Sequence, residues 1–215
     1  MSIRILLADD HTMVRQGLCQ ILSQHPEFEV VAEASSGAEA VEACRTLQPD
    51  VAVVDIAMKE LNGIDATAQI VRHSPRTAVL ILSMYSDERY VVRAVRAGAR
   101  GYLLKNSAGD ELVEAIRHVQ RGRAFFSPAV ARAFNDGLAR LRHSGEIEDR
   151  YELLTERERH VYQLLAEGNS NKDIANHLNL SLHTVETHRS RIMEKLDVHS
   201  TAELVLSAVR RGLVT

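Results

Sequence analysis

The chain has 215 residues, of which 45% are hydrophobic and 26% are charged, and its formal net charge is −3. At roughly 100–200 residues per domain, this length allows one large domain or two smaller ones. The hydrophobic content excludes general disorder, and no apolar run approaches the roughly 18 residues that span a bilayer. The N-terminus turns acidic at Asp9, too early for a signal peptide, so we expect a cytoplasmic location. The two cysteines, Cys19 and Cys44, form no CxxC motif, which argues against a disulfide or a structural zinc site.

The first 121 residues alternate between short aliphatic runs and amphipathic stretches. The runs typical of strands are residues 3–8, 28–32, 51–54, 78–82 and 101–104. The stretches typical of helices lie near 12–24, 37–47, 63–72, 87–97 and 108–121. Strands that are each followed by a helix favour a parallel sheet with helices on both faces. We therefore predict an α/β domain over 1–121 with a five-stranded, doubly wound parallel sheet of the flavodoxin-like kind.

The pattern changes after Gly122. Ser127-Pro128 is a plausible helix start for 127–142, whereas 136–150 is rich in charged and polar residues and glycine. We expect 122–150 to be a partly helical linker. Residues 151–215 show no strand pattern and predict four helices, near 155–167, 171–178, 182–196 and 200–211. We therefore expect a second, all-α domain over 151–215.

Polar side chains follow the predicted strands of the first domain at the point where each strand ends. Asp9 and Asp10 follow the first strand, Asp55 the third, Ser83 the fourth and Lys105 the fifth. Because parallel strands all end at the same edge of a sheet, these side chains should converge where α/β sheets bind ligands. A single Asp after a strand is often only a helix cap or a solvated loop residue. Because this set lies at successive strand ends, we favour a shared functional site over that explanation.

The chemistry of this set points to phosphoryl transfer. Gathered carboxylates need a cation, and an oxygen-only ligand set with few carboxylates suits Mg²⁺. A carboxylate beside Mg²⁺ can attack phosphorus and form an aspartyl phosphate. A lysine would neutralise charge on the transferring group, and a serine hydroxyl would hydrogen-bond the new phosphate.

Four motifs in 1–121 resemble the receiver domain of bacterial response regulators. They are Leu-Ala-Asp-Asp-His at 7–11, Val-Val-Asp-Ile-Ala-Met at 53–58, Leu-Ser-Met at 82–84 and Gly-Tyr-Leu-Leu-Lys at 101–105. The resemblance implies that Asp55 accepts phosphate from a sensor histidine kinase. It also implies that Asp10, Asp55 and the backbone carbonyl of Ala57 hold Mg²⁺, and that Asp9 acts mainly through water. Ser83 and Tyr102 would form a switch pair.

Three positions depart from the usual receiver pattern. Lys59 stands where the family usually has Pro, Ser83 replaces the commoner Thr, and Asn106 follows Lys105 where many receivers have Pro. Each of these departures leaves the chemical roles in place, so phosphorylation is still expected. The Asn at 106 makes the cis peptide bond usual there unexpected, because non-proline cis bonds are rare.

The second domain contains two amphipathic helices joined by a short turn at 179–181, which is the helix-turn-helix arrangement. In that motif the second helix enters the major groove of DNA. With Val185, Ile192 and Leu196 facing inward, the opposite face carries polar residues. Thr187, Glu186 and Arg191 are candidates for base contacts. The candidates for phosphate or backbone contacts are Lys172, Thr184, His188, Arg189 and Lys195, with Arg189 turned furthest inward. Ser190, on the outer face, is a further candidate for a DNA contact.

Helix pairs of this kind also occur in protein-binding bundles, and residues 151–215 carry 8 basic and 9 acidic residues, so bulk charge does not favour DNA. The motifs at 154–158, 165–175 and 181–196 nevertheless resemble the LuxR-type DNA-binding domain. A receiver joined to this domain resembles the NarL/FixJ-type response regulators. That resemblance implies DNA binding and a homodimer, with the helix near 200–211 at the dimer contact.

We therefore expect a two-component response regulator in which phosphorylation of Asp55 controls dimerisation and sequence-specific DNA binding. Two alternatives remain open. One is a phosphatase that uses Asp55 as nucleophile, although enzymes of the haloacid-dehalogenase type need a second Asp two residues later, where this chain has Ala57. The other is a regulator whose C-terminal helices bind a protein, which a gel shift at low salt would distinguish.

Overall fold

The structure is a computed structural model, and it describes residues 2–134, 150–211 and 213–214. The chain forms two compact units. One contains the β-sheet and the helices packed on it, and the other contains the C-terminal helices. Within the described residues, every helix is too short or too polar to cross a membrane.

The first unit is built on a six-stranded parallel sheet with the strand order β2-β1-β3-β4-β5-β6. Its strands are β1 (Ile3–Ala8), β2 (Phe28–Ala34), β3 (Val51–Asp55), β4 (Ala78–Ser83), β5 (Gly101–Leu104) and β6 (Phe125–Phe126). All residues of β3 and β4 are buried, which is the expected state of central strands covered on both faces.

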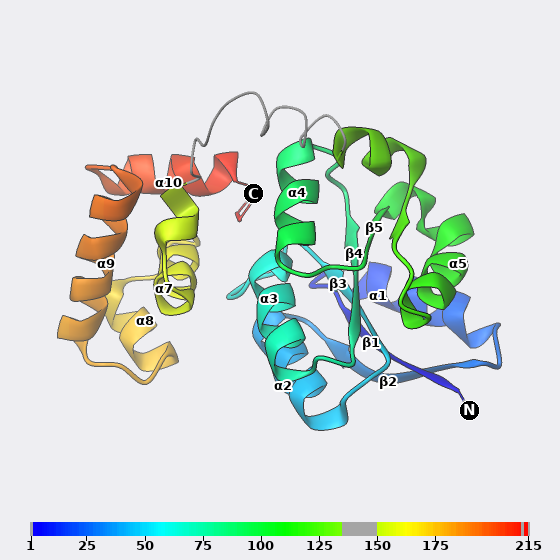
Figure 1. Cartoon of the computed structure of the whole chain (residues 1–215). Coiled ribbons are helices and arrows are strands. Elements are labelled where there is room, and N and C mark those ends of the chain that lie inside the picture. The colour runs from blue at the N-terminus through cyan, green and yellow to red at the C-terminus, as the bar shows by residue number, and fades with distance from the viewer. Residues whose placement is uncertain (1, 135–149, 212, 215) are drawn as a thin grey trace. The chain divides into compact units, whose positions relative to one another are not determined.

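Alternate side chains of the strands feed two separate cores. Leu6, Val54 and Ile81 belong to one core, together with residues of α2 (Gly37–Leu47), α3 (Gly63–His73) and α4 (Glu88–Arg96). Leu7 and Val53 belong to the other core, together with residues of α1 (Thr12–Ser23) and α5 (Ala108–Gln120). Figure 1 shows α2, α3 and α4 on one side of the sheet and α1 and α5 on the other. The sheet is therefore doubly wound, as the sequence predicts.

The sheet differs from the prediction at one edge. Phe125 and Phe126 pair with β5 as a sixth strand, inside the segment that the sequence assigned to a linker. Residues 128–134 are helical, and Val130 is fully buried in the same core as α4. The aromatic pair lacks the length that a sequence pattern needs to indicate a strand. The rest of the predicted linker, 135–149, lies outside the described residues.

The second unit is helical, as predicted. It contains a 3-10 turn η2 (Arg150–Leu153) and the helices α7 (Glu156–Ala166), α8 (Asn171–His177), α9 (Leu182–Leu196) and α10 (Thr201–Arg210). Capping boxes start α7 at Thr155 and α8 at Ser170. The helices share one core, which includes Tyr162, Val185 and Ile192.

Candidate functional site

The polar side chains predicted to converge do lie at the carboxyl edge of the sheet. Asp9 and Asp10 directly follow β1, Asp55 ends β3, Ser83 ends β4, and Lys105 directly follows β5 and opens a short 3-10 turn, η1 (Lys105–Ser107). Asp9, Asp55 and Ser83 are at most 3% exposed. The two strands that end in Asp55 and Ser83 each run one residue further than predicted. The backbone of both residues is therefore held by pairing with the neighbouring strands, which fixes where their side chains start.

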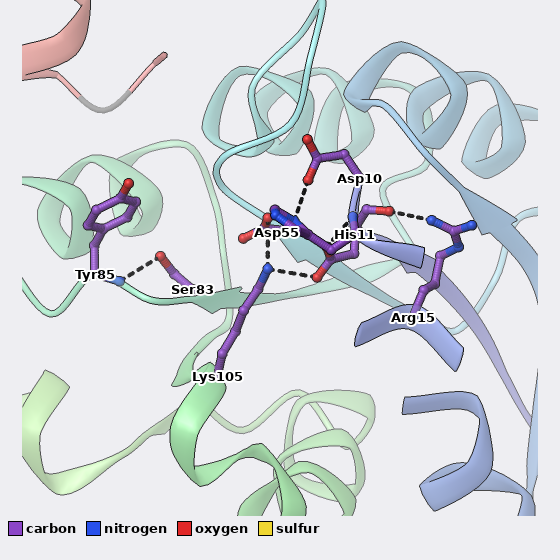
Figure 2. A network of polar contacts seen from close by, with 8 residues as sticks. Asp10, His11, Arg15, Asp55, Ser83, Tyr85 and Lys105 are labelled. Carbon is purple, nitrogen blue, oxygen red and sulfur yellow. Dashed lines mark hydrogen bonds and ion pairs between the residues drawn. The ribbon is translucent and has the colours of Figure 1, made fainter. Parts of the chain in front are cut away.

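Lys105 joins two of the buried carboxylates (Figure 2). Its Nζ lies 2.8 Å from Oδ2 of Asp9 and 2.9 Å from Oδ2 of Asp55. Burial raises the pKa of Asp55, the Lys105 ammonium opposes this rise, and the neighbouring Asp9 adds to it. Burial lowers the pKa of Lys105, but its ion pairs with Asp55 and Asp9 outweigh burial and raise it. The lysine is therefore held charged between the two carboxylates.

The backbone at the start of α3 lies very close to the backbone of Asp55 and helps to position it. Asn62 caps α3, and its side-chain oxygen accepts hydrogen bonds from the backbone N–H groups of Ile64 and Asp65. Gly63 follows, and a Cβ at that position would lie 1.9 Å from the carbonyl oxygen of Asp55. The N-terminus of α3 thus packs directly on the backbone of Asp55 and needs a residue without a side chain. Ala57 lies in the bend between them.

Two residues that the sequence analysis did not single out hold the acidic loop after β1. Nδ1 of His11 lies 2.7 Å from Oδ1 of Asp10 and 3.3 Å from Oδ1 of Asp9. Arg15 donates a 2.6 Å hydrogen bond to the carbonyl oxygen of Asp9, and its Nε lies 2.9 Å from Oε2 of Glu33. Figure 2 shows His11 beside Asp10 and the guanidinium group of Arg15 directed toward this loop. Arg15 falls one turn into α1 and faces the loop, a relation that helical spacing from Asp9 could have revealed.

The donor set fits a divalent cation. Asp9, Asp10, His11 and Asp55 each offer one ligand atom, and these atoms all lie within 4.8 Å of one another. One oxygen each of Asp9, Asp10 and Asp55 is buried without accepting a well-directed hydrogen bond, although Lys105 and His11 lie within ion-pair distance of them. Buried anionic oxygens of this kind are the ligands that hard cations prefer. The acidic cluster is therefore compatible with Mg²⁺.

Ser83 and Tyr102 are coupled through the start of the segment after β4. Oγ of Ser83 accepts a 3.1 Å hydrogen bond from the backbone N–H of Tyr85. The hydroxyl of Tyr102, a fully buried residue, donates a 2.6 Å hydrogen bond to the carbonyl oxygen of Tyr85. Burial raises the pKa of Tyr102 well above its usual range, and a hydrogen bond with Ser83 opposes that rise. A movement of Ser83 would therefore reach Tyr102 through Tyr85, which the sequence analysis named neither as a ligand nor as part of the switch.

In the second unit, α9 presents a polar outer face. Ser181 caps the helix by accepting a hydrogen bond from the backbone N–H of Thr184. Val185, Ile192 and Leu196 are buried, as the helical spacing predicts. The exposure of the candidate DNA contacts divides them into two groups: Lys172, Glu186, Ser190 and Arg191 are exposed, whereas Thr184, Thr187, His188, Arg189 and Lys195 are half-buried.

Two of the half-buried candidates, Arg189 and Lys195, bond to residues of neighbouring helices in the unit. Nζ of Lys195 lies 2.6 Å from Oε2 of Glu158, a carboxylate that is 2% exposed. Arg189 donates a 2.7 Å hydrogen bond to the hydroxyl of Thr201. Burial lowers the pKa of His188, and its Nδ1 is buried without a hydrogen-bond partner among the described residues. Arg189 and Lys195 therefore help to fix α9 on its neighbours.

Comparisons with known proteins agree with both units. Residues 5–117 match the response regulator receiver domain, and residues 152–208 match the luxR family of bacterial regulatory proteins. The transcriptional regulatory protein LiaR of Bacillus subtilis is 41% identical over 212 residues, covering 99% of each chain. The response regulator protein VraR of Staphylococcus aureus is 36% identical over 214 residues, covering 100% of each chain.

Solved structures give the same result. A complex of the two-component response regulator RcsB with DNA has 27% sequence identity and a TM-score of 0.59, covering 97% of this chain and 100% of that one. A LuxR-family response regulator from Aurantimonas has 34% identity and a TM-score of 0.61, covering 65% of this chain and 99% of that one. With a receiver unit, a LuxR-type helical unit and full-length relatives that share both, the chain belongs to the LuxR-type response regulators.

Proposed function

We propose that Asp55 accepts a phosphoryl group from the phosphohistidine of a sensor histidine kinase, and that this modification controls DNA binding by the second unit. The observation that carries the proposal is the Lys105 bridge. A lysine held charged between the buried carboxylates of Asp9 and Asp55 places a cation where negative charge would develop during transfer. The membership of the chain in the response regulators supports the same reaction.

In the proposed transfer, a carboxylate oxygen of Asp55 attacks the phosphorus of the phosphohistidine. The O–P bond forms as the P–N bond breaks, and the leaving imidazole takes up a proton. Lys105 stabilises the charge on the phosphoryl oxygens, and the hydroxyl of Ser83 is placed to donate to one of them. Asp9, Asp10, Asp55 and the carbonyl of Ala57 are the residues that would hold Mg²⁺, which when bound supplies charge neutralisation.

The response to phosphorylation would begin at Ser83. If its hydroxyl turns to the phosphate, Ser83 no longer accepts the hydrogen bond from the N–H of Tyr85. The backbone of Tyr85 is then free to move, and its carbonyl oxygen, which accepts the hydrogen bond from the Tyr102 hydroxyl, would move with it. Ser83 and Tyr102 thus serve as the switch pair. Phosphorylation would then bias an equilibrium between two conformations of the receiver, as switches of this kind do.

For the output, we propose that α9 enters the major groove of double-stranded DNA. Exposed Glu186 and Arg191, with half-buried Thr187, are the proposed base contacts. Exposed Lys172 and Ser190, with half-buried Thr184 and His188, are the proposed backbone contacts. Arg189 and Lys195, which interact with Thr201 and Glu158, would contribute mainly by positioning the helix. The DNA complex of the similar protein RcsB supports DNA binding by a protein of this kind.

We further propose a homodimer in the phosphorylated state, because exposed Leu206 and Val209 give α10 an apolar strip that a second copy would cover. We place the protein in the cytoplasm, and we propose that it is not an enzyme, since its relatives are transcriptional regulators. The phosphatase alternative lacks a second catalytic carboxylate two residues after Asp55, where Ala57 stands.

The direct test is labelling with acetyl phosphate and Mg²⁺, followed by identification of the modified residue by mass spectrometry. The Asp55→Asn variant should lose all labelling. Asp197→Asn is a matched control, because Asp197 is exposed in the second unit and has a left-handed backbone that Asn tolerates. Equal labelling of the Asp55→Asn variant and the wild type would show that another residue is the acceptor.

A further inference from the structure

Three exposed arginines gather at the amino edge of the receiver sheet, where its strands begin. Arg100 directly precedes β5, and Arg121 and Arg123 flank Gly122 between α5 and β6. A Cβ added to Gly122 would meet Nη1 of Arg100 at 4.0 Å. The guanidinium group of Arg100 therefore lies beside the turn that carries the other two arginines. We call Arg100, Arg121 and Arg123 the arginine patch.

Backbone hydrogen bonds hold the two segments of the arginine patch together. The N–H groups on both sides of Gly122 donate to the carbonyl oxygen of His118, at 3.1 and 3.0 Å. Gly122 itself has a φ of 76°, in the left-handed region that favours glycine. The N–H of Phe125 donates a 3.1 Å hydrogen bond to the carbonyl oxygen of Arg100, which ties this turn to the start of β5. The backbone of the patch is thus fixed, while its three side chains are exposed.

Within the described part of the chain, no carboxylate neutralises the arginine patch. None of its three guanidinium groups forms an ion pair or a side-chain hydrogen bond with another described residue. Other exposed arginines of the same unit are paired: Arg117 lies beside Glu27, and Arg45 beside Glu42. Neighbouring positive charges repel one another, so the patch favours a partner that brings several negative charges at once.

The chemistry of the patch and its place in this chain both favour DNA as that partner. The planar guanidinium group donates two parallel hydrogen bonds to a phosphate, which a lysine cannot do. Double-stranded DNA carries one negative charge per about 1.7 Å of helix axis, so neighbouring arginines can each meet a phosphate. The second unit of the same chain is of the LuxR type, so DNA held by α9 is present at a high effective concentration for the receiver unit. An acidic protein has no such tether.

We propose that Arg100, Arg121 and Arg123 bind the phosphate backbone of double-stranded DNA next to the site that α9 reads. The proposal rests on the proposed function, because α9 supplies the DNA. Contacts to phosphates are independent of sequence, so the patch would add affinity and not base specificity. The patch is separate from the phosphoacceptor site, since β5 runs from Arg100 at one edge of the sheet to Lys105 at the other, roughly 15 Å away.

The test measures how salt weakens DNA binding by the full-length protein after treatment with acetyl phosphate and Mg²⁺. Fluorescence anisotropy is recorded at about 50–200 mM salt with two duplexes: a short one that holds only the site selected by the wild type, and a long one that adds about 20 base pairs on each side. The patch variant is Arg100→Gln/Arg123→Gln. The charge-matched control is Arg45→Gln/Arg89→Gln, which changes exposed arginines at the end of α2 and the start of α4.

Each phosphate contact contributes about 0.9 to the slope of log affinity against log salt concentration. On the long duplex the patch variant should therefore lose about 2 from the magnitude of this slope, and on the short duplex less than about 0.5, while the control matches the wild type on both. Labelling of Asp55 should be the same in all three proteins.

The proposal is overturned if the patch variant keeps the wild-type slope on the long duplex, which would leave an acidic protein as the better partner. It is also overturned if the control loses as much, since bulk charge would then explain the effect, or if both duplexes are affected equally. Wild-type protein that binds neither duplex would contradict the proposed function itself, whereas tight binding with unchanged slopes would contradict the arginine patch alone.

Discussion

Replacing Gly63 by Ala should damage both the fold and the phosphoacceptor. The added Cβ would lie 1.9 Å from the carbonyl oxygen of Asp55, 2.7 Å from its carbonyl carbon and 3.0 Å from the Cα of Ile56. Real Cβ atoms essentially never approach other atoms within 3.0 Å, so the Asp55 carbonyl and α3 must separate by at least about 1.1 Å. The neighbours are backbone atoms at the end of a central strand and just after it, which cannot rotate away as a side chain can.

The magnitude follows from the same geometry. Overpacking in a tight core costs about 1–3 kcal/mol and sometimes more, and here we expect the upper end, about 3 kcal/mol. In a unit of this size that loss lowers its unfolding temperature by about 10 °C. Because a misplacement of about 1 Å can cost about 100-fold in rate, labelling of Asp55 by acetyl phosphate should slow by about that factor even well below the melting temperature.

The assay is thermal unfolding by circular dichroism together with the labelling rate at 20–25 °C, roughly room temperature. Gly17→Ala is the matched control, because a Cβ at this position inside α1 meets no atom within 4 Å. That control should be neutral or stabilising by about 0.5–1 kcal/mol, since Ala is the better helix former. If Gly63→Ala melts and is labelled like the wild type, the close approach of α3 to Asp55 is not what positions the acceptor.

Three further predictions concern the switch, the second unit and its ligand. Tyr102→Phe removes a buried hydroxyl that donates a hydrogen bond, so thermal unfolding should show a loss of about 0.5–1.5 kcal/mol; no loss would mean that the bond is not formed in solution. Burial raises the pKa of Glu158, but its bonds to Lys195 and Thr155 outweigh burial and lower it. This carboxylate therefore contributes stability above its unfolded pKa of about 4.3, and the contribution is lost as the pH falls through the lower folded value. Thermal melts should show Glu158→Gln less stable than the wild type by about 1.5–3 kcal/mol at pH 7 and a narrowing gap below about pH 4.3; a gap independent of pH would refute the ion pair. In DNA-binding assays Thr187→Ala should relax sequence preference, whereas Lys172→Ala should weaken binding to all sequences and reduce the salt slope by about 1; unchanged affinities in both would mean that the recognition face lies elsewhere.

The positions of the strand ends in the receiver unit were predictable because parallel strands all end at the same edge of a sheet. Asp9, Asp55 and Lys105 lie at three strand ends, and the β-branched runs before them fix the edge that they share. The inward face of α9 followed from helical spacing in the same way. These features depend on periodicity, which a single sequence displays.

Other features depend on contacts that no periodicity encodes. His11 faces Asp10 because the chain turns at the end of β1. The sequence does not specify which rotamer a histidine adopts at an N-cap position, so this contact was not predictable. The pairing of Lys195 with Glu158 joins α9 to the start of α7, so a residue that looks like a phosphate contact in sequence is engaged within the unit. The strand Phe125–Phe126 is too short to produce an alternating pattern.

The central claim is that modification of Asp55 controls DNA binding, and one measurement tests it most directly. DNA fragments are selected from a random pool by the full-length protein, and affinity for them is then measured at one fixed salt concentration with and without acetyl phosphate and Mg²⁺. We predict that the phosphodonor raises the affinity of the wild type at least about tenfold, or about 1.4 kcal/mol, and leaves Asp55→Asn unchanged. An equal rise in the Asp55→Asn variant, or no rise in a wild type that is fully phosphorylated, would contradict the account.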